Sequence, residues 1–223
     1  MKPAELCEVL YAEFGPQGWW PGETAFEVIA GAVLTQNTAW SNVEKAIANL
    51  KKAKLLTPTK LAHAPLSKIR AAIKPSGYYN QKAVRIRAIA KYLAENYGDD
   101  LTRFLSQPTC SLSHEVESWK GVGPETRDSI LLYAAGKPVF VIDAYTVRIT
   151  ERTGMAGRNG DGKARSSYSE LQAFFENELP RNPRLFNEFH ALLVHLGKNY
   201  CRKTKPLCVS CPVRTRCRKR TRR

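Results

Sequence analysis

Apolar residues recur along most of this chain at intervals of three and four positions, a spacing that places them on one face of an α-helix. In the stretch from 81 to 97, Ile86, Ile89 and Leu93 follow this spacing and Lys and Arg stand between them. Similar patterns predict further helices over 26–34, 41–50, 66–73, 113–119, 124–135, 145–152, 166–178 and 183–199. We therefore expect an all-α protein.

Local signals refine these elements. Ser41 followed by Glu44 has the form of a capping box, and Pro124 suits the first turn of a helix. Ser113 is expected to cap the helix that runs to residue 119. The run Val139–Ile142 has the composition of a strand, but it is short and has no partner run, so we interpret it as a buried connection.

Composition excludes several classes of protein. The mean hydropathy is −0.38, and no window reaches the roughly 18 apolar residues that a membrane span needs. Glu5 and Glu8 lie near the start, which lacks an apolar leader, so we expect a cytoplasmic protein rather than a secreted one. These features argue against a membrane protein, a secreted disulfide miniprotein and a disordered chain.

The charge is unevenly distributed. The chain has 35 Lys and Arg against 20 Asp and Glu, and the stretch from Lys198 to Arg223 has 11 basic residues and no acidic one. Such an excess favours a polyanionic partner, of which nucleic acid is the most common. The alternative is a basic tail that is simply solvated.

Four of the six cysteines lie within this basic stretch, at positions Cys201, Cys208, Cys211 and Cys217. Four sulfur ligands in one short segment are typical of a metal site, either zinc or an iron–sulfur cluster. The single C-x2-C pair and the wide outer spacings favour a [4Fe–4S] cluster over zinc. Cys7 and Cys110 are interpreted as small apolar filling residues.

The segment Trp119-Lys-Gly-Val-Gly-Pro-Glu125 predicts a tight turn between two helices. Glycines at 121 and 123 allow the backbone to approach another surface, and the amides at the start of the second helix suit a phosphate. A lone G-x-G also occurs in ordinary helix–turn–helix connections, but in so basic a chain we favour phosphate binding.

Asp143 follows four apolar residues, so its carboxylate is expected to be partly desolvated. Such a group is a candidate for catalysis. It also fits the N-cap of the helix that follows, and both roles are compatible. The four histidines show no ligand pattern, and His190 and His195 are interpreted as surface or packing residues.

Taken together, the K-G-V-G hairpin, the Asp 18 residues after Glu125 and the C-x6-C-x2-C-x5-C segment resemble the endonuclease III branch of the helix-hairpin-helix DNA glycosylases. The resemblance implies an all-α, two-lobed fold with a C-terminal cluster loop. One domain would comprise residues 26–138, and the other residues 1–25 and 139–223. The implied partner is double-stranded DNA with a damaged base, bound by a monomer without membrane contact.

The resemblance also implies roles for single residues. Asp143 would be the essential carboxylate. The hairpin residues would grip the DNA backbone, with a monovalent cation bound there: Lys120, Gly121, Val122 and Gly123. Gln36 would fill the gap left by the extruded nucleotide, and Tyr78 would wedge into the opposite strand. Without the resemblance, Gln36 would be a polar loop residue and Tyr78 a half-buried core aromatic.

One position departs from the family pattern. Members that also cleave the strand have a lysine two residues after the second hairpin glycine, and this chain has Glu125 there. A carboxylate cannot form the imine that strand cleavage needs. We therefore predict a monofunctional glycosylase that uses water and has at most weak lyase activity.

The aromatic residues near the start resemble those of the 3-methyladenine glycosylase subgroup called MagIII. The matching positions are Trp19, Trp20, Pro21 and Trp40, together with Glu125 after the hairpin. A cationic alkylated purine would gain about 0.5–2 kcal/mol from such rings. The alternative for Trp19 and Trp20 is a hydrophobic lid on the core.

The sequence thus predicts a DNA base-excision glycosylase for alkylated purines such as 3-methyladenine. Three alternatives stay open: a glycosylase for oxidised pyrimidines or mismatched bases, with or without lyase activity; a lesion-binding protein of the same fold without catalysis; and a zinc-containing DNA-binding module.

Overall fold

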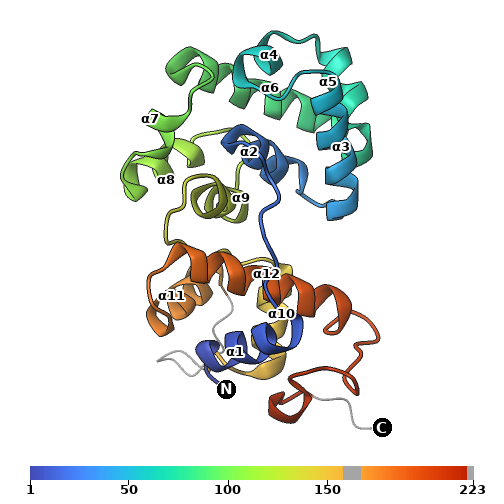
Figure 1. Cartoon of the computed structure of the whole chain (residues 1–223), viewed down its shortest axis with the longest axis vertical. Coiled ribbons are helices and arrows are strands. Elements are labelled where there is room, and N and C mark those ends of the chain that lie inside the picture. Colours follow the sequence, from blue (N-terminus) through green and yellow to red (C-terminus); the bar gives the residue numbers. More distant parts are fainter. Residues whose placement is uncertain (158–166, 220–223) are drawn as a thin grey trace. The chain divides into compact units, whose positions relative to one another are not determined.

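The computed structural model describes residues 1–157 and 167–219, and every regular element within these residues is a helix (Figure 1). The expected all-α class is therefore confirmed. The chain forms two compact units. Residues Trp20–Lys137 make up one unit, and Met1–Trp19 with Pro138–Arg223 make up the other.

The unit Trp20–Lys137 is built around α6, the longest helix of the described chain. Its elements are α2 (Ala25–Leu34), α3 (Trp40–Lys52), α4 (Pro58–His63), α5 (Leu66–Ile73), the 3-10 turn η1 (Lys74–Ser76), α6 (Tyr79–Tyr97), α7 (Thr102–Leu105), α8 (Thr109–Glu117), α9 (Pro124–Ser129) and the π-helical turn η2 (Ile130–Ala134). Helix α6 packs against α4 and α5, and α2 packs against α3 and η2. Buried aliphatic residues of these helices form the core of the unit.

The second unit joins the start of the chain to its last third. Its elements are α1 (Pro3–Phe14), α10 (Ala144–Thr153), α11 (Tyr168–Glu178), α12 (Pro183–Asn199) and the 3-10 turn η3 (Arg214–Arg216). Helix α12 packs against both α1 and α10. Phe140 stacks on Phe175 with ring centroids 4.4 Å apart, and Phe186 and Phe189 complete this buried aromatic core.

Two predicted helices, over 66–73 and 183–199, have the observed bounds. The expected cap at Ser41 was wrong, because α3 begins one residue earlier and its N-cap is Ala39. Glu44 instead accepts a hydrogen bond from Nε1 of Trp40 at 2.9 Å. The cap at Ser113 was also wrong: α8 already begins at Thr109, and Pro108 precedes it.

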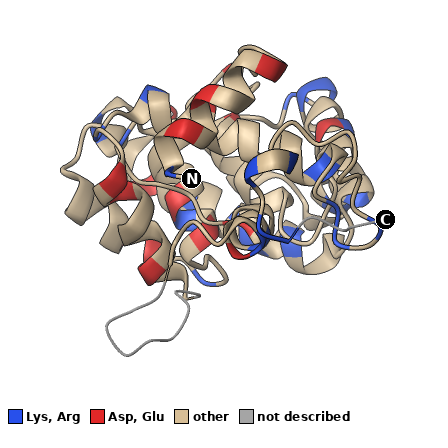
Figure 2. Cartoon of the chain, turned by 90° about the horizontal axis from the view of Figure 1, so that it is seen from below, with Lys and Arg blue, Asp and Glu red and all other residues tan. Residues whose placement is uncertain are grey.

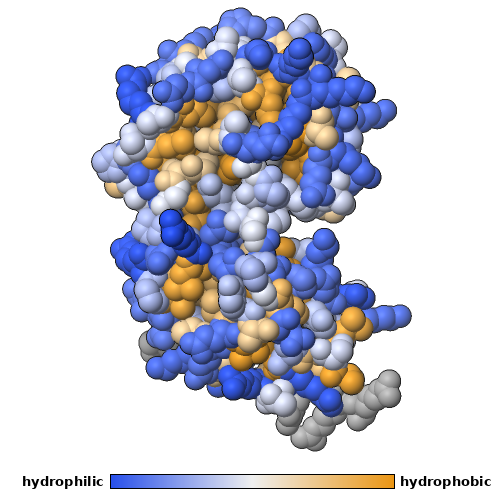
Figure 3. Space-filling model, in the orientation of Figure 1, coloured by the Kyte–Doolittle hydropathy of each residue, from blue (hydrophilic) through white to orange (hydrophobic). Residues whose placement is uncertain are grey.

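The connection predicted over 139–142 is confirmed. This segment is neither helix nor strand, and Phe140, Val141 and Ile142 are buried. On the face that Figure 3 shows, hydrophilic residues predominate and apolar residues reach the surface in limited patches. No helix among the described residues combines the length and the hydrophobicity that a membrane crossing requires.

Candidate functional site

The predicted hairpin joins α8 to α9 in the unit Trp20–Lys137. Gly121 has φ +84°, in the region that favours glycine, and a Cβ there would collide with the guanidinium of Arg85. Gly123 is the N-cap of α9, and its carbonyl accepts from the amide of Arg127 at 2.9 Å. Lys120 and both glycines are exposed. The turn therefore presents backbone and one cation to solvent.

Gln36 lies in the segment after α2 and is bonded to the hairpin. Its Nε2 donates to the carbonyl of Gly121 at 3.1 Å and to Oγ1 of Thr126 at 2.9 Å. Its Oε1 accepts from the guanidinium of Arg85 on α6. The structure therefore brings Gln36 and the hairpin together. Arg85 was not predicted as a site residue, because in the sequence it resembles the other basic residues that separate the apolar positions of this helix.

A groove of about 500 Å³ runs beside the hairpin, between α6 and the turn that follows α8. Its walls include Arg85 and Lys120, and also Trp119 and the half-exposed Val84. It combines cationic and apolar surface within one unit.

Lys82 was also not predicted as a site residue, although it lies one helical turn before the buried Ile86 on α6. Only 2% of the residue is exposed, and its Nζ donates to the carbonyls of Leu34 and Ser76 and to Oγ1 of Thr38, at 2.7–2.8 Å. Burial, and to a smaller extent the positive charge of Arg85, lowers the pKa of this amine to about 8.

Tyr78 precedes the first residue of α6 in the left-handed conformation, with φ +44°. Its ring is among the most exposed large hydrophobic groups of the described chain, at 69%. The alternative of a half-buried core aromatic is therefore wrong. The assignment of Tyr78 as a wedge stays a prediction.

Two of the predicted aromatic residues are in contact within the same unit. The rings of Trp20 and Trp40 meet edge to face with centroids 4.7 Å apart, and Tyr133 lies 5.1 Å from Trp20. A Cβ at Gly31 would lie 2.9 Å from the indole of Trp20, so this glycine makes room for the ring on α2. Trp20 therefore packs on a helix as well as facing Trp40.

The remaining aromatic positions are placed differently. Pro21 is exposed, and Trp19 belongs to the other unit. Tyr133 was not singled out, because it stands in the apolar run of η2 and nothing in that pattern marks it as different.

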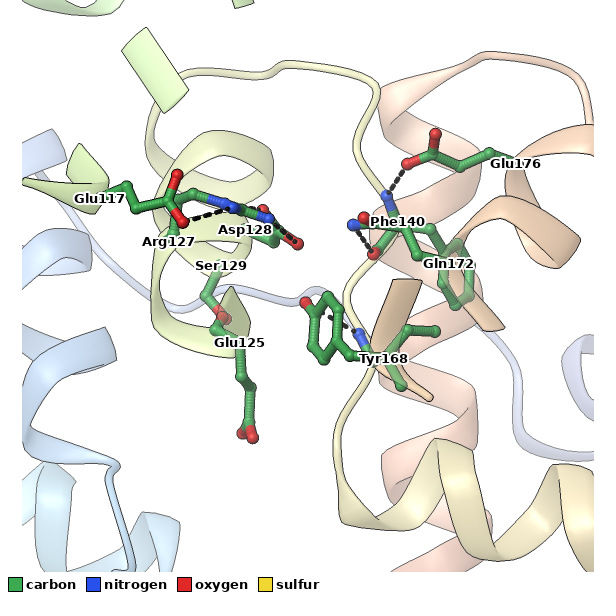
Figure 4. A network of polar contacts seen from close by, with 10 residues as sticks. Glu117, Glu125, Arg127, Asp128, Ser129, Phe140, Tyr168, Gln172 and Glu176 are labelled. Carbon is green, nitrogen blue, oxygen red and sulfur yellow. Dashed lines mark hydrogen bonds and ion pairs between the residues drawn. The ribbon is translucent and has the colours of Figure 1, made fainter. Parts of the chain in front are cut away.

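Glu125 occupies the first turn of α9 and is exposed. Figure 4 shows its side chain extending away from Arg127 and Asp128. Arg127 pairs with the buried Asp128 at 2.7 Å, and Oγ of Ser129 donates to the backbone carbonyl of Glu125 at 2.7 Å. The position that the resemblance associates with a lysine nucleophile thus presents a carboxylate.

In the second unit, Asp143 is the N-cap of α10, as its place in the sequence predicted. Its Oδ1 accepts from the amide of Thr146 at 2.7 Å and from the hydroxyl of the same residue at 2.8 Å. The side chain is 11% exposed, so the carboxylate is largely desolvated yet still reaches the surface. The two bonds from Thr146 fix its orientation.

The other oxygen of Asp143, Oδ2, lies 3.7 Å from Nε2 of His190 on α12. That separation is too long for a hydrogen bond. His190 is buried, and burial lowers its pKa, although the Asp143 carboxylate acts in the opposite direction. At neutral pH the imidazole is therefore uncharged. Of the two roles predicted for His190, surface or packing, the buried side chain has the second, and it borders the candidate catalytic carboxylate.

Helix α11 holds the segment that leads into Asp143 (Figure 4). Nε2 of Gln172 donates to the carbonyl of Phe140 at 2.8 Å, and the amide of Phe140 donates to the Glu176 carboxylate at 2.9 Å. The Phe140 ring is buried in the aromatic core. These contacts hold the backbone that leads into Asp143 in place.

The four clustered cysteines line one small cavity of about 30 Å³ in the second unit. Its other walls include Ile149, Leu196 and Val213, and the lining has no carboxylate. Within the described residues, no three Cys, His, Asp or Glu are arranged as ligands of a metal ion. The donor set nevertheless fits a sulfur-ligated group, because four thiols converge on one apolar space.

Electrostatics at these cysteines favour a positive partner. Burial raises the pKa of Cys211 to about 11, and the charges of the other three cysteines raise it too. Four thiolates held together therefore need a compensating cation. Arg152 on α10 supplies part of it, since its NH1 lies 3.3 Å from Sγ of Cys201. Cys110, in contrast to the expectation for a filling residue, is exposed, whereas Cys7 is buried.

The segment that contains these cysteines is strongly basic. All Lys and Arg between 198 and 219 are exposed, and Figure 2 shows them in the ribbon that leads to the C-terminal end. The cysteine loop thus carries cations on its outside.

Comparison with known proteins identifies a related family. The sequence matches the family described as HhH-GPD superfamily base excision DNA repair protein over residues 30–174. A Methanocaldococcus jannaschii protein, provisionally named a DNA repair glycosylase, is 41% identical over 215 residues, which cover 96% of this chain and 94% of that protein.

Two solved structures are similar. H. pylori 3-methyladenine DNA glycosylase (MagIII) bound to 1,N6-ethenoadenine has a TM-score of 0.74 and 28% identity, covering 89% of this chain and 98% of its own. An endonuclease III in a non-covalent DNA complex has a TM-score of 0.80 and 22% identity, covering 98% and 96%. The second likeness concerns the fold alone.

Proposed function

The chain belongs to the HhH-GPD superfamily of base excision DNA repair proteins, and we propose that it releases alkylated purines from double-stranded DNA by hydrolysis. It is a DNA N-glycosylase of the endonuclease III-like, all-α kind. The observation that supports a hydrolytic role most directly is Asp143: a desolvated, oriented carboxylate at the start of a helix, beside an uncharged histidine.

In the proposed reaction, the N-glycosidic bond breaks and the base leaves with the bonding electrons. The sugar then carries positive charge, which the Asp143 carboxylate stabilises. A water molecule bonds to C1′ of the sugar, and its proton passes to the carboxylate or to solvent. A purine alkylated at N3 or N7 is cationic before it leaves and departs neutral, so it needs little help from an acid.

Damaged DNA would be held by residues of the other unit. Backbone amides of the hairpin and Lys120 would contact a phosphate, and a monovalent cation at the hairpin remains part of the proposal. Gln36 and Tyr78 would offset part of the few kcal/mol that flipping a nucleotide costs. Gln36 and Tyr78 belong to one unit and Asp143 to the other. In this proposal the first two residues help to open the duplex, and Asp143 acts on the glycosidic bond.

Cys201, Cys208, Cys211 and Cys217 would hold a [4Fe–4S] cluster. When bound, the cluster supplies positive charge to four thiolates and links the ends of the basic loop. The chain's own residues do the rest: Arg148 donates to the carbonyls of Cys201 and Gly197, at 2.7 and 3.1 Å, and so fastens the loop to α10. A zinc ion in the same place is the alternative.

The function is tested with a panel of duplexes, each with one lesion: 1,N6-ethenoadenine, N7-methylguanine, thymine glycol, or uracil or thymine opposite guanine. We expect release of the purine lesions. Release of the pyrimidines alone would contradict the alkylpurine assignment, and binding without release of any base would support a non-catalytic lesion-binding protein.

Strand cleavage should depend on alkali. Because Glu125 cannot form an imine, products of the wild-type protein should break only after alkali treatment, and borohydride should trap no protein–DNA adduct. In Glu125→Lys, the side chain is exposed and can carry an amine, so a trapped adduct should appear. Substantial trapping by the wild type would show that another amine acts as nucleophile.

The aromatic residues are tested by Trp40→Ala. Loss of its ring from the pair with Trp20 should lower alkylpurine release by about tenfold, the equivalent of about 1–2 kcal/mol of stacking and cation–π energy. Uncharged ethenoadenine should lose less than cationic N7-methylguanine. Phe104→Leu, a change at a fully buried ring of the same unit, serves as the control for general effects on folding. An equal loss for both lesions would argue against cation–π recognition.

A further inference from the structure

The buried ammonium of Lys82 has no role in the function proposed so far. Its three hydrogen-bond acceptors are two backbone carbonyls and a hydroxyl, and no ion pair joins it to a carboxylate within the described residues. Burying a charge without an opposite charge is unfavourable. What this lysine contributes, and an apolar side chain would not, is its three hydrogen bonds.

The three acceptors lie in the two segments that contain Gln36 and Tyr78, the side chains predicted to enter the duplex. Leu34 and Thr38 lie on either side of Gln36, each two residues away, and Ser76 lies two residues before Tyr78. A protonated amine has three N–H groups, so one atom satisfies all three acceptors at once. Oγ1 of Thr38 also bonds to the carbonyl of Ser76, which joins the two segments directly.

The same residue holds Tyr78 through its backbone. The amide of Lys82 donates to the carbonyl of Tyr78 at 3.0 Å, while its side chain reaches Ser76 on the other side of Gly77. Tyr78 has positive φ, at 44°. A bulky residue keeps this conformation only where its surroundings hold it there. Lys82 contacts the backbone on both sides of Gly77, and so contributes to holding this segment.

We propose that Lys82 is a positioning residue that holds the Gln36 segment and the Tyr78 segment at a fixed separation, so that both side chains enter the duplex together when the damaged nucleotide is flipped. This inference rests on the proposed function. It assigns to Lys82 an effect on opening the duplex and none on breaking the glycosidic bond, which belongs to Asp143.

The test compares Lys82→Met with the wild type in two kinds of duplex. Methionine keeps the length of the side chain and loses all three hydrogen bonds. Single-turnover release of a lesion paired with thymine should fall by about tenfold or more, whereas release of the same lesion opposite an abasic site should change by less than about threefold, because that lesion flips at little cost. An equal fall in both would overturn the proposal.

A second readout needs no bond cleavage. 2-Aminopurine next to the lesion should brighten when the wild type binds, and Lys82→Met should give less than half of that increase at saturating protein. The effects of Gln36→Ala and Tyr78→Ala on this increase should be non-additive in the wild type and additive in the Lys82→Met background. Non-additivity that persists without the lysine would contradict the proposal.

Two further variants keep the test decisive. Lys91→Met removes an exposed lysine from the same helix and should behave as the wild type. Thr38→Val removes one acceptor and keeps the β-branched shape, so it should reproduce part of the effect even if Lys82→Met does not fold. If 2-aminopurine brightens with the wild type but no base is released, only the proposed glycosylase function is contradicted. If 2-aminopurine does not brighten with the wild type, the positioning role of Lys82 is contradicted. Release of base in that case would still support the glycosylase function.

Discussion

Asp143→Asn should lower the rate of base release by about 10³-fold while leaving the affinity for lesion DNA about unchanged. The side-chain oxygen of asparagine can still accept from the amide of Thr146, so the N-cap of α10 is kept. The variant therefore removes the negative charge and little else. Single-turnover release and equilibrium DNA binding, measured on the same duplex, check the two halves of this prediction.

Asp143→Ala separates catalysis from capping. It should be as inactive as the Asn variant and, in addition, less stable by about 1 kcal/mol, since α10 loses its cap. Thermal unfolding of both variants measures the difference. Full activity of Asp143→Asn would refute the assignment of this carboxylate as the catalytic group.

Cys211→Ser should cause the second large effect, because the proposed cluster would lose one of its four ligands: the purified protein should contain less iron and absorb less visible light than the wild type. Burial raises the pKa of the Cys211 thiol to about 11, so a bound cation would stabilise its thiolate, and serine is a poorer ligand. Each kcal/mol of stability lost lowers the Tm of a chain of this size by about 2–4 °C. Iron and zinc analysis, absorption spectra and thermal unfolding give the result.

The matched control is Cys110→Ser, at an exposed cysteine outside the cavity. It should keep the iron content and the Tm of the wild type. A colourless wild-type protein that contains zinc would support the zinc alternative, and wild-type protein without either metal would contradict the assignment of these four residues as ligands.

Periodicity predicted the helical class and the bounds of α5 and α12, because their apolar positions alone decide where they pack. Local caps were predicted less well. Ser41 and Ser113 are favourable cap residues, yet their helices begin earlier, where Trp40 bonds Glu44 and Pro108 ends the preceding turn. Asp143 was predicted correctly as a cap, since the apolar run before it leaves α10 no earlier start.

The candidate site divides in the same way. Chemistry that lies within one short segment, such as the hairpin and the cysteine loop, is visible in the sequence. Lys82, Arg85 and His190 are not, because each has partners 44 to 49 positions away in the chain, although Lys82 also bonds to Ser76, six positions before it. Their surroundings exist only once the helices have packed, and in the sequence a buried lysine looks like any exposed one.

The backbone at Tyr78 has a consequence for attempts to stabilise this enzyme. A tyrosine in the left-handed region costs of order 1–2 kcal/mol, and its exposed ring regains little of that through packing. Asparagine tolerates the same dihedral angles more easily, so selection for heat resistance alone would tend to replace the tyrosine. Such a screen would select against the residue that we expect to enter the duplex. At position 78, thermal stability and repair activity therefore favour different residues.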